Sequence, residues 1–541
     1  MTRSPSRNLL RDARAQTPLW QLYPVFFVFV YLSHLTLLRL PYYWDEGGYY
    51  IPAALDFYHT GALVPHFTNA HPPLPSILLA GWWRLSGFVP SGTRTFICMV
   101  AAAALLAVFA LARKLLGTPA AVATTLLTAI YPIWFAQSTL AHADIFAATF
   151  TLWAFALYLT RPPGSGASST QLQIAVALLF TLAVLSKETA IVQPAALAAL
   201  ELVLLVCAWK TPPLRRAHAG WLAALSFPLL PLAAWFAYHH HVTGFTFGNP
   251  AYLRYNATAN FTVAHIFHAL QSRAMHLFWQ RNIWVPLMLA LACLAMPARP
   301  QEQAQQIPRS ALRTIALLVA ANWVFFSVMG GAPLTRYLLP VYPLLLLVSV
   351  AIWRSRTRLW PLLAALTAAG FISALWINPP YSFAPEDNLT YRDMIVVHQE
   401  AIDYLARNYP DATVLTAWPV TTDLFCPELG YTRRSFKVVA LDDFTAEDIR
   451  QAAEQPVAFD TVLVVTTHYI PPALRGYLTE HPNSSRGVEF ARAPVLTPAE
   501  IAAELGGTIV WQDERNGEWA AIVRLARART TAPAAIPRSP L

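Results

Sequence analysis

The stretch YYWDEGGYY, residues 42–50, places two adjacent carboxylates directly after the first long apolar segment of the chain. That segment, residues 19–40, would be roughly 33 Å long as a helix, which is enough to cross a hydrocarbon core of about 30 Å. Ionised carboxylates beside apolar segments are costly unless they face water, a metal or a cationic ligand. The stretch therefore predicts that Asp45 and Glu46 lie at a membrane–water boundary, either as functional acids or as a solvated helix end.

The composition of the chain is that of a membrane protein. Of its 541 residues, 56% are hydrophobic and only 12% are charged, whereas soluble domains carry about 25% charged residues. Many apolar runs of roughly 15–22 residues accompany this bias, so we expect a polytopic α-helical membrane domain. The net charge of +9 does not indicate nucleic-acid binding, because the basic residues lie mainly between apolar runs, where they set topology. The four cysteines form no disulfide framework and no CxxC site.

The distribution of charge assigns regions of the chain to the two sides of a membrane. Residues 1–18 are basic and predict a cytoplasmic flank, followed by an uncleaved first span in place of a signal peptide. Residues 19–377 then predict a transmembrane domain of about eleven or twelve helices. The polar segments between the apolar runs alternate between basic and non-basic only if one of the runs 75–89 and 95–112 does not cross the membrane. The sequence leaves open which one. This topology predicts a multi-pass protein of the inner (plasma) membrane.

Two long external loops are expected, at residues 41–75 and 239–281. The first contains an aromatic-rich segment that fits a short helix lying in the membrane interface and ending at Gly61. The second begins with a run of three histidines, residues 239–241, which resembles a metal-binding tract. An ordinary interfacial loop is the favoured interpretation of that run.

The composition changes after residue 378, where acids, prolines and short apolar strands appear. We expect a small α/β domain at 380–528 outside the membrane, followed by a disordered tail at 529–541. The expected elements are strands at 414–417 and 461–465, helices at 393–408, 446–454 and 498–505 with Thr445 and Thr497 as N-caps, and a hairpin of 508–512 and 519–524 that turns at Asn516-Gly517.

Several polar residues fall at the predicted outer ends of the spans. Besides Asp45 and Glu46 they are His71, Asp144, Lys187, Glu188, Arg336 and Tyr337. Two acidic positions and several cations at one membrane face suit a transfer reaction. In such a reaction a carboxylate takes a proton from an acceptor hydroxyl and cations stabilise a leaving phosphate.

Each of these candidates also has a purely structural interpretation. Asp144 could cap a helix, and Arg336 could reach out to lipid headgroups. Lys187 and Glu188 could form a self-neutralising pair at the interface. His71 could be an ordinary loop histidine. The ordered set therefore carries more weight than any single member.

That ordered set resembles the GT-C glycosyltransferases. More narrowly it is similar to the branch that contains the dolichyl-phosphate-mannose–protein mannosyltransferases and the bacterial lipid A aminoarabinose transferases. The resemblance covers about residues 20–345. Its motifs are Asp45-Glu46 after the first span, His71-Pro72-Pro73-Leu74, Thr93-Arg94, Ala112-Arg113-Lys114-Leu115-Leu116-Gly117, Ala143-Asp144, Leu185-Ser186-Lys187-Glu188-Thr189 and Arg336-Tyr337-Leu338-Leu339-Pro340.

The resemblance implies an integral membrane enzyme that moves a sugar from a polyprenyl-phosphate donor to an acceptor hydroxyl on the outer face, with inversion. It implies that Asp45 is the general base, with Glu46 beside it, and that Asp144 is a second acid on the acceptor side. His71, Lys187 and Arg336 would bind the donor phosphate, with possible support from Glu188, Arg94 and Tyr337. The aminoarabinose transferases carry Lys at the position of His71, and the mannosyltransferases carry His.

The expected partners are a polyprenyl-phosphate-linked sugar, membrane lipids and an acceptor that is a lipid, a glycan or a protein. This branch implies no metal, so no cofactor is expected. Two other classes fit the composition: a transporter or flippase for lipids or sugars, and a non-catalytic envelope assembly protein. A carrier would favour charges on midplane helices, whereas here the candidate charges gather at one face.

Overall fold

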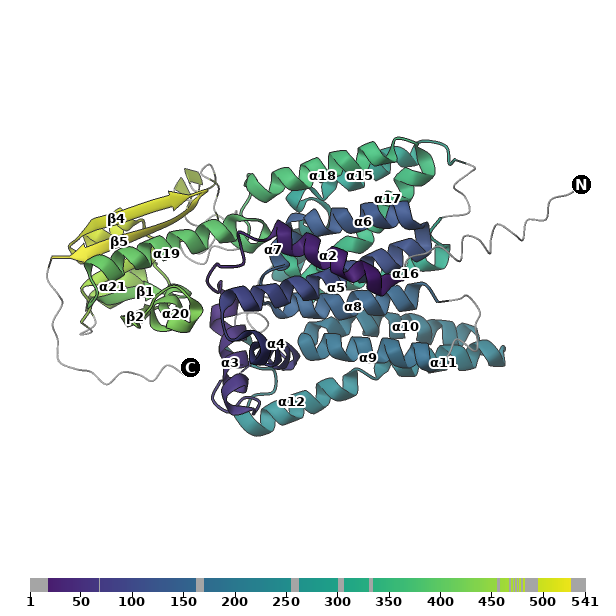
Figure 1. Cartoon of the computed structure of the whole chain (residues 1–541), viewed down its shortest axis with the longest axis horizontal. Coiled ribbons are helices and arrows are strands. Elements are labelled where there is room, and N and C mark those ends of the chain that lie inside the picture. The colour runs from purple at the N-terminus through teal and green to yellow at the C-terminus, as the bar shows by residue number, and fades with distance from the viewer. Residues whose placement is uncertain are drawn as a thin grey trace, which may run out of the picture.

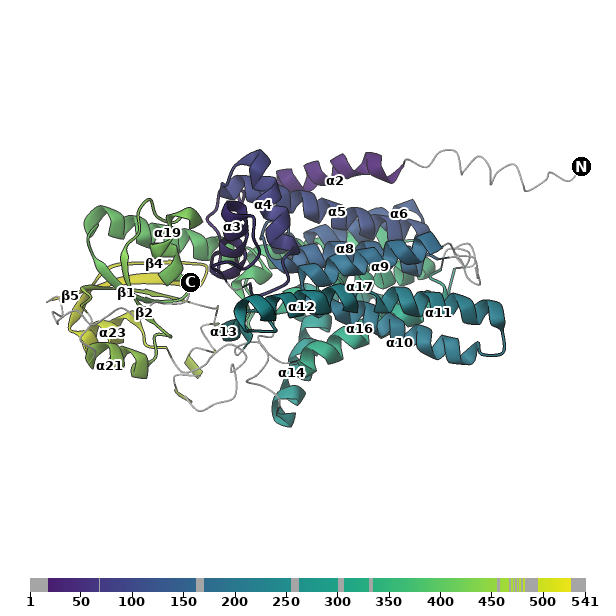
Figure 2. The same cartoon turned by 90° about the horizontal axis from the view of Figure 1, so that it is seen from below.

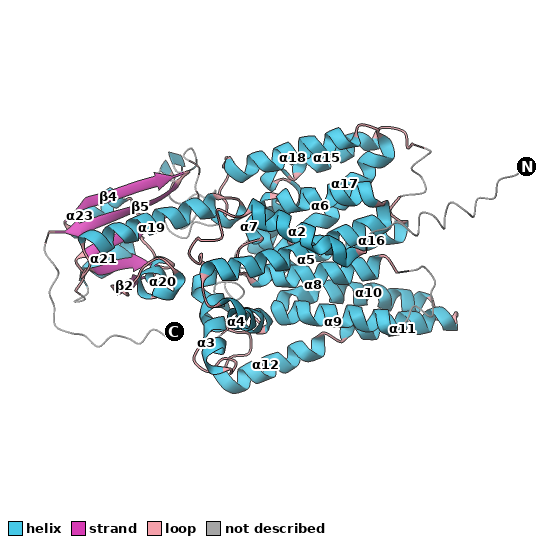
Figure 3. Cartoon of the chain, viewed as in Figure 1, coloured by secondary structure: helices cyan, strands magenta, loops and turns pink. Residues whose placement is uncertain are grey.

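The computed structural model describes residues 18–67, 69–161, 170–253, 262–299, 306–329, 334–454, 458–466, 469, 471, 474, 476–477, 480–481 and 495–526. A bundle of long, roughly aligned helices forms most of the molecule, and a small α/β domain lies at one end of it (Figure 1). All five strands belong to that domain (Figure 3). The predicted tail at 529–541 lies outside the described residues, as do residues 1–17 of the predicted cytoplasmic flank.

The main helices of the bundle are α2 (Leu19–Ser33), α5 (Pro90–Leu116), α6 (Thr118–Ile130), α8 (Ala143–Leu159), α9 (Thr170–Ser186), α10 (Val192–Cys207), α11 (Pro212–Ser226), α12 (Leu229–Thr243), α15 (Trp284–Leu294), α16 (Arg309–Val328), α17 (Tyr342–Arg356) and α18 (Trp360–Trp376). The helical elements that connect them are η1 (Glu46–Tyr50), α3 (Ile51–Thr60), α4 (Leu74–Ser86), α7 (Pro132–Gln137), η2 (Glu188–Ile191), α13 (Pro250–Leu253), α14 (Val263–Phe278), η4 (Gln280–Asn282) and η6 (Thr335–Leu338).

The apolar character predicted for this bundle is present in its helices. Within the described ranges, four helical stretches are long and apolar enough to cross a membrane, namely Pro90–Leu116, Glu188–Cys207, Pro212–Thr243 and Arg309–Val328. Six shorter apolar helices accompany them, beginning with α2 and ending with α18. The bundle therefore has the mostly helical membrane architecture that the composition predicts.

Two details of the expected first spans are refined by the structure. The first helix was expected over residues 19–40, but α2 ends at Ser33 and the chain continues in tight turns closed by bonds such as Leu37 N to His34 O at 2.8 Å. Of the two runs that the charge pattern could not separate, α5 has 27 residues and α4 only 13. At 1.5 Å per residue α4 is about 20 Å long, too short for a hydrocarbon core of about 30 Å, whereas α5 is long enough.

The first loop forms a compact structure at the end of the bundle nearest the α/β domain (Figure 2). Its π-helical turn η1 continues directly into α3, and α3 ends at Gly61, whose φ of 69° suits a residue without a side chain. The short helix expected in this aromatic segment is therefore present.

The α/β domain contains η7 (Pro385–Asp387), α19 (Thr390–Asn408), β1 (Thr413–Ala417), α20 (Val420–Phe425), η8 (Pro427–Leu429), β2 (Lys437–Leu441), α21 (Ala446–Glu454), β3 (Thr461–Val465), α23 (Pro498–Leu505), β4 (Gly507–Arg515) and β5 (Glu518–Leu525). Its mixed sheet has the order β2-β1-β3-β5-β4, in which β2, β1 and β3 are parallel and β5 is antiparallel to both of its neighbours.

The elements expected in this domain are present. Thr497 accepts a hydrogen bond from the backbone of Glu500 in a complete capping box, and Thr445 accepts one from Asp448 N at 3.1 Å. The β4–β5 hairpin turns at Asn516 and Gly517, whose φ values are 53° and 88°, as a two-residue turn with two positive φ angles requires. Strand β2 was not expected.

A buried ionic cluster joins three helices at the end of α8 that is opposite Asp144. Glu201 of α10 is fully buried and accepts hydrogen bonds from Tyr158 Oη at 2.5 Å, Arg161 Nη2 at 2.5 Å and His218 Nδ1 at 2.6 Å. A carboxylate removed from water in this way is stable only with such partners. The cluster therefore ties α8, α10 and α11 together, far from the candidate chemistry.

We predict that Glu201→Ala lowers the stability of the protein by about 3–5 kcal/mol, because it leaves the buried Tyr158 hydroxyl and two half-buried cations without their acceptor. The measurement is the thermal unfolding of the purified full-length protein followed by tryptophan fluorescence. Glu447→Ala is the matched control, because Glu447 is 63% exposed and pairs with Arg450 on the surface of α21; its effect should stay within about 0.5 kcal/mol. Equal unfolding temperatures for the two variants would contradict the prediction.

Candidate functional site

The backbone around Asp45 is held in a strained conformation by contacts from the α/β domain. Trp44 has a φ of 44°, which is unfavourable for a residue with a side chain. Its ring lies edge-on against Trp418 with 4.5 Å between ring centroids, and a Cβ on Gly48 would come within 3.1 Å of the same indole. Tyr42 N also donates to the carbonyl of Leu429 at 3.0 Å. The α/β domain thus fixes the loop that carries Asp45.

Glu46 has a different environment from its neighbour. It is fully buried, and its carboxylate pairs with the fully buried Arg94 at 3.1 Å. It also accepts hydrogen bonds from Tyr43 N at 2.8 Å and Ala141 N at 2.7 Å. Arg94 in turn donates to the carbonyl of Thr139 at 2.9 Å. The two acids that the sequence groups together therefore separate, because Glu46 and Arg94 fasten the loop to the bundle.

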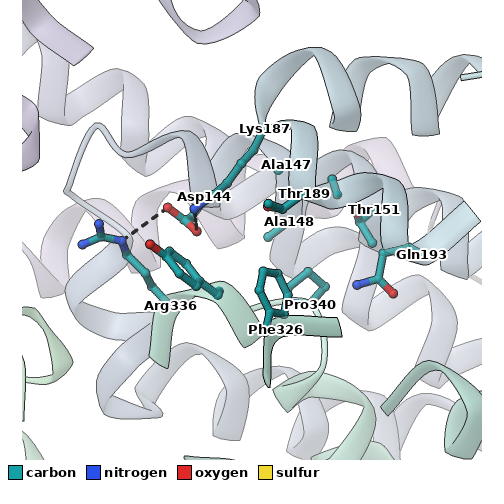
Figure 4. A pocket seen from close by; sticks show the side chains of 12 residues that line it. Asp144, Ala147, Ala148, Thr151, Lys187, Thr189, Gln193, Phe326, Arg336 and Pro340 are labelled. Carbon is teal, nitrogen blue, oxygen red and sulfur yellow. Dashed lines mark hydrogen bonds and ion pairs between the residues drawn. The ribbon is translucent and has the colours of Figure 1, made fainter. Parts of the chain in front are cut away.

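Asp144 lies in the first turn of α8, where His142 and not Asp144 is the N-cap residue. Its Oδ1 atom accepts a hydrogen bond from Lys187 Nζ at 2.6 Å, and its Oδ2 atom lies 3.4 Å from Arg336 Nε. Figure 4 shows the carboxylate between these two cations. Asp144 therefore joins residues from α8, η6 and the end of α9.

Arg336 is the centre of the site. It is 1% exposed, and besides Asp144 it forms ion pairs through Nη2 with Asp45 and through Nη1 with Glu386. Glu386 belongs to η7, in the segment that leads from α18 to the α/β domain. The interpretation in which Arg336 reaches lipid headgroups does not fit this burial, since all three of its nitrogen positions face carboxylates.

His71 and Glu188 form a neighbouring pair. His71 Nδ1 lies 2.9 Å from Glu188 Oε2, and the imidazole stacks on Tyr50 at a centroid distance of 5.8 Å. Lys187 and Glu188 therefore pair with Asp144 and His71, and not with one another as a self-neutralising pair would. The Lys187 ammonium also lies 4.0 Å from the ring centroid of Tyr337, a cation–π distance.

A pocket of about 320 Å³ of empty space opens beside this cluster (Figure 4). Charged groups form one end of it, and apolar side chains and the polar pair Thr151 and Gln193 form the rest. Its lining residues are Asp144, Ala147, Ala148, Thr151, Lys187, Thr189, Ala190, Gln193, Phe326, Arg336, Tyr337 and Pro340. A second pocket of about 220 Å³ reaches His71 from the side of Tyr49 and Tyr50. The charged cluster thus lines one end of a pocket whose other walls are largely apolar.

The site holds more negative than positive charge. Asp45, Asp144 and Glu386 surround Arg336, and Lys187 adds only a second cation. Burial, reinforced by Asp45 and opposed by Arg336, raises the pKa of Glu386 to about 7. Among the residues that the structure describes, no group of three or more His, Cys, Asp or Glu side chains is arranged to hold a metal ion.

The structure therefore brings together Asp45, Asp144, Lys187, Arg336 and Tyr337, and places His71 and Glu188 as a pair close by. Glu46 and Arg94 form a separate buried network behind the loop. Sequence reasoning missed Glu386. The available signal was the adjacent acids Glu386 and Asp387, which follow the last apolar run after a short Pro-rich segment at the start of the α/β domain.

Comparison with known proteins agrees with this architecture. Residues 70–236 match the family model of dolichyl-phosphate-mannose-protein mannosyltransferase. This region includes His71, Asp144 and Lys187, but neither Asp45 nor Arg336. No curated protein sequence matches the chain.

Two crystal structures of ArnT from Cupriavidus metallidurans share the fold. The one bound to undecaprenyl phosphate has a TM-score of 0.53 at 14% identity, with 93% of this chain and 97% of that chain covered. The apo structure has a TM-score of 0.53 at 15% identity, with 93% and 98% covered. The chain thus shares the fold of these structures, the GT-C fold, and part of it matches the mannosyltransferase family model.

We predict that Glu46→Leu or Arg94→Met alone destabilises the protein by about 3–5 kcal/mol, because each leaves a buried charge without its partner. The double variant should lose much less than the sum of the two, since it leaves no unpaired charge. Thermal unfolding of the four proteins provides the measurement. Additive losses would show that the two side chains do not act as a buried pair.

Proposed function

We propose that this protein transfers a sugar from a polyprenyl-phosphate donor to an acceptor hydroxyl at the outer face of the inner (plasma) membrane, with inversion at the anomeric carbon. The observation that supports this most is the convergence of Asp45, Asp144 and Lys187 on the buried Arg336 beside a pocket with an apolar body. The likeness to an ArnT structure bound to undecaprenyl phosphate points to the same class of donor.

Arg336, Lys187 and His71 bind the phosphate of the donor in this proposal. Phosphate is a leaving group whose developing charge needs cations, and a guanidinium can contact two of its oxygens at once. Lys187 adds a point charge on the pocket wall, and His71, oriented by Glu188 and by stacking on Tyr50, adds a ring N–H. The prenyl chain then follows the apolar surfaces that leave the charged end of the pocket.

Asp45 acts as the general base. Its side chain is 10% exposed, compared with 3% for Asp144 and 4% for Glu386, so it is the most accessible of the three acids. Its ion pair with Arg336 Nη2 holds the carboxylate beside the phosphate site. In this position Asp45 accepts the proton from the attacking hydroxyl. Asp144 stays paired with Lys187 and positions the acceptor.

The topology completes the proposal. A cytoplasmic N-terminus followed by α2 puts the loop of Asp45 on the outer side, together with the α/β domain that contacts it. The charges of the site lie at one end of the bundle, as an interfacial enzyme requires, and not at its middle, where the alternative of a transporter would need them.

We predict that Asp45→Asn abolishes transfer while leaving the fold and the donor site intact. Loss of a general base lowers the rate by about 10²–10⁴-fold. The measurement is mass spectrometry of cell-surface lipids, glycans and proteins from cells that lack the protein and are complemented with each variant. The modification that depends on the wild-type protein should be absent with Asp45→Asn and present with the matched control Asp56→Asn, which alters a carboxylate of α3 outside the site. A wild-type level of modification with Asp45→Asn would refute the assignment.

We predict that Lys187→Met weakens binding of undecaprenyl phosphate to the purified protein by about ten- to a hundredfold, the equivalent of one lost hydrogen bond to a charged group. The Lys210→Met variant, which removes a lysine at the opposite end of α10 from η2, should bind like the wild type. The binding constants are measured by microscale thermophoresis in detergent. Unchanged affinity in Lys187→Met would exclude Lys187 from the phosphate site.

A further inference from the structure

Glu386 is an unexplained part of the site. It is 3% exposed, it comes from the segment that links the bundle to the outer domain, and the proposed reaction assigns it no role. Its only cationic partner among the described residues is Arg336, whereas Asp144 has Lys187 as well. A buried carboxylate with one shared counter-charge is costly, so its presence calls for an explanation.

We propose that Glu386 occupies, in the donor-free enzyme, the place on Arg336 that the donor phosphate takes, and that it releases Arg336 when the phosphate binds. This inference rests on the proposed function. It makes Glu386 a positioning residue, since it acts through Arg336 and not on the reacting atoms.

The geometry of the guanidinium favours such an exchange. Arg336 faces Asp45 through Nη2, Glu386 through Nη1 and Asp144 through Nε, so each nitrogen position is already directed at a carboxylate. A phosphate that binds two nitrogens of one edge of this guanidinium therefore competes with at least one carboxylate. Carboxylate and phosphate are both recognised by the fork of a guanidinium, so one can take the place of the other.

Among the three acids, Glu386 is the one best able to leave. Asp144 is held by Lys187 at 2.6 Å, and the loop of Asp45 is fixed by Trp418 and by the Glu46–Arg94 pair. Glu386 lies in the single turn of η7 between α18 and α19. The pair it makes is thus the one whose loss disturbs the fewest other contacts.

The segment that would move has a second buried guanidinium beside it. Arg281 is 2% exposed, and none of its guanidinium nitrogens has a hydrogen-bond partner among the described residues. It stacks at 3.7 Å from the ring centroid of Phe383, three residues before Glu386. An acidic segment released from Arg336 therefore remains beside a second buried cation, which already attracts Asp387 of the same segment.

Protonation of Glu386 also weakens its ion pair with Arg336. The proposed exchange can therefore be measured through the pH dependence of phosphate binding. The charged or titratable groups around Glu386 are Asp45 from the first loop, Asp144 from α8, Arg336 from η6, Asp387 from its own turn and Tyr43 before Asp45. Its pKa of about 7 means that the carboxyl is neutral below that pH and competes with phosphate above it. Phosphate affinity should therefore fall as the pH rises through 7.

The test compares the wild type with Glu386→Gln, which mimics the neutral acid, and with the adjacent control Asp387→Asn. Each is a purified full-length protein titrated with undecaprenyl phosphate between about two pH units below and two above neutrality. We expect Glu386→Gln to bind as the wild type does at low pH, and about tenfold more tightly one unit above pH 7. The ratio of the two affinities cancels the ionisation of the lipid phosphate itself. Asp387→Asn, whose carboxylate contacts Thr335, should keep the fall in affinity with rising pH, displaced to lower pH because the Asp387 charge helps to raise the pKa of Glu386.

Parallel pH profiles for the wild type and Glu386→Gln, or weaker binding by the variant above pH 7, would overturn the role of Glu386 while leaving the proposed function standing. An equal rise in affinity in Asp387→Asn would also overturn it, because the effect would then be a general one of negative charge. Failure of undecaprenyl phosphate to bind any of the proteins, or binding unaffected by Lys187→Met, would remove the proposed function and with it this inference.

Discussion

The fold is organised around one guanidinium that has been taken out of water. Arg336 meets three carboxylates from three separate parts of the chain, namely the first loop, the start of α8 and the entrance to the outer domain. A low-dielectric environment strengthens each of these ion pairs and makes any unpaired charge destabilising. Lys187 pairs with Asp144, whereas Asp45 and Glu386 share Arg336. In the function that we propose, the phosphate of a lipid carrier binds there by replacing a carboxylate.

Two further ion pairs at this end of the bundle hold the cluster in position. The Glu46–Arg94 pair fastens the loop after α2 to α5 and to the turn before α8, so that Asp45 and Asp144 keep a fixed separation. His71 and Glu188 connect the segment before α4 with the start of η2. The polar residues that touch the pocket carry the chemistry that we propose. The polar residues that do not touch it hold the backbone of the site in position.

Much of this could be predicted from the sequence, for identifiable reasons. Long apolar runs identify a helical membrane domain, and local signals such as the capping box at Thr497 or the Asn516-Gly517 turn identify elements in the outer domain, because those signals act over a few residues. The order of polar motifs identified Asp45, Asp144, Lys187 and Arg336 as one set. The ion-pair partners of these residues could not be predicted from the sequence, because they depend on three-dimensional proximity. Asp45 and Glu46 are adjacent but pair with different arginines, and the adjacent Lys187 and Glu188 pair with Asp144 and His71. Glu386 gave no motif, since an acid in a linker looks the same whether it faces water or a guanidinium fifty residues away.

The contact between Trp44 and Trp418 bears on how this protein could be re-engineered. The α/β domain is attached to the bundle through one covalent junction, yet its contacts shape the loop of Asp45, and the segment that leads into it contributes Glu386. It is therefore not an exchangeable module in the way that a tethered binding domain would be. A chimaera with another domain in this place would keep every motif of the bundle. It would still lack the Trp418 contact and the Glu386 carboxylate, which help to set the geometry of those motifs.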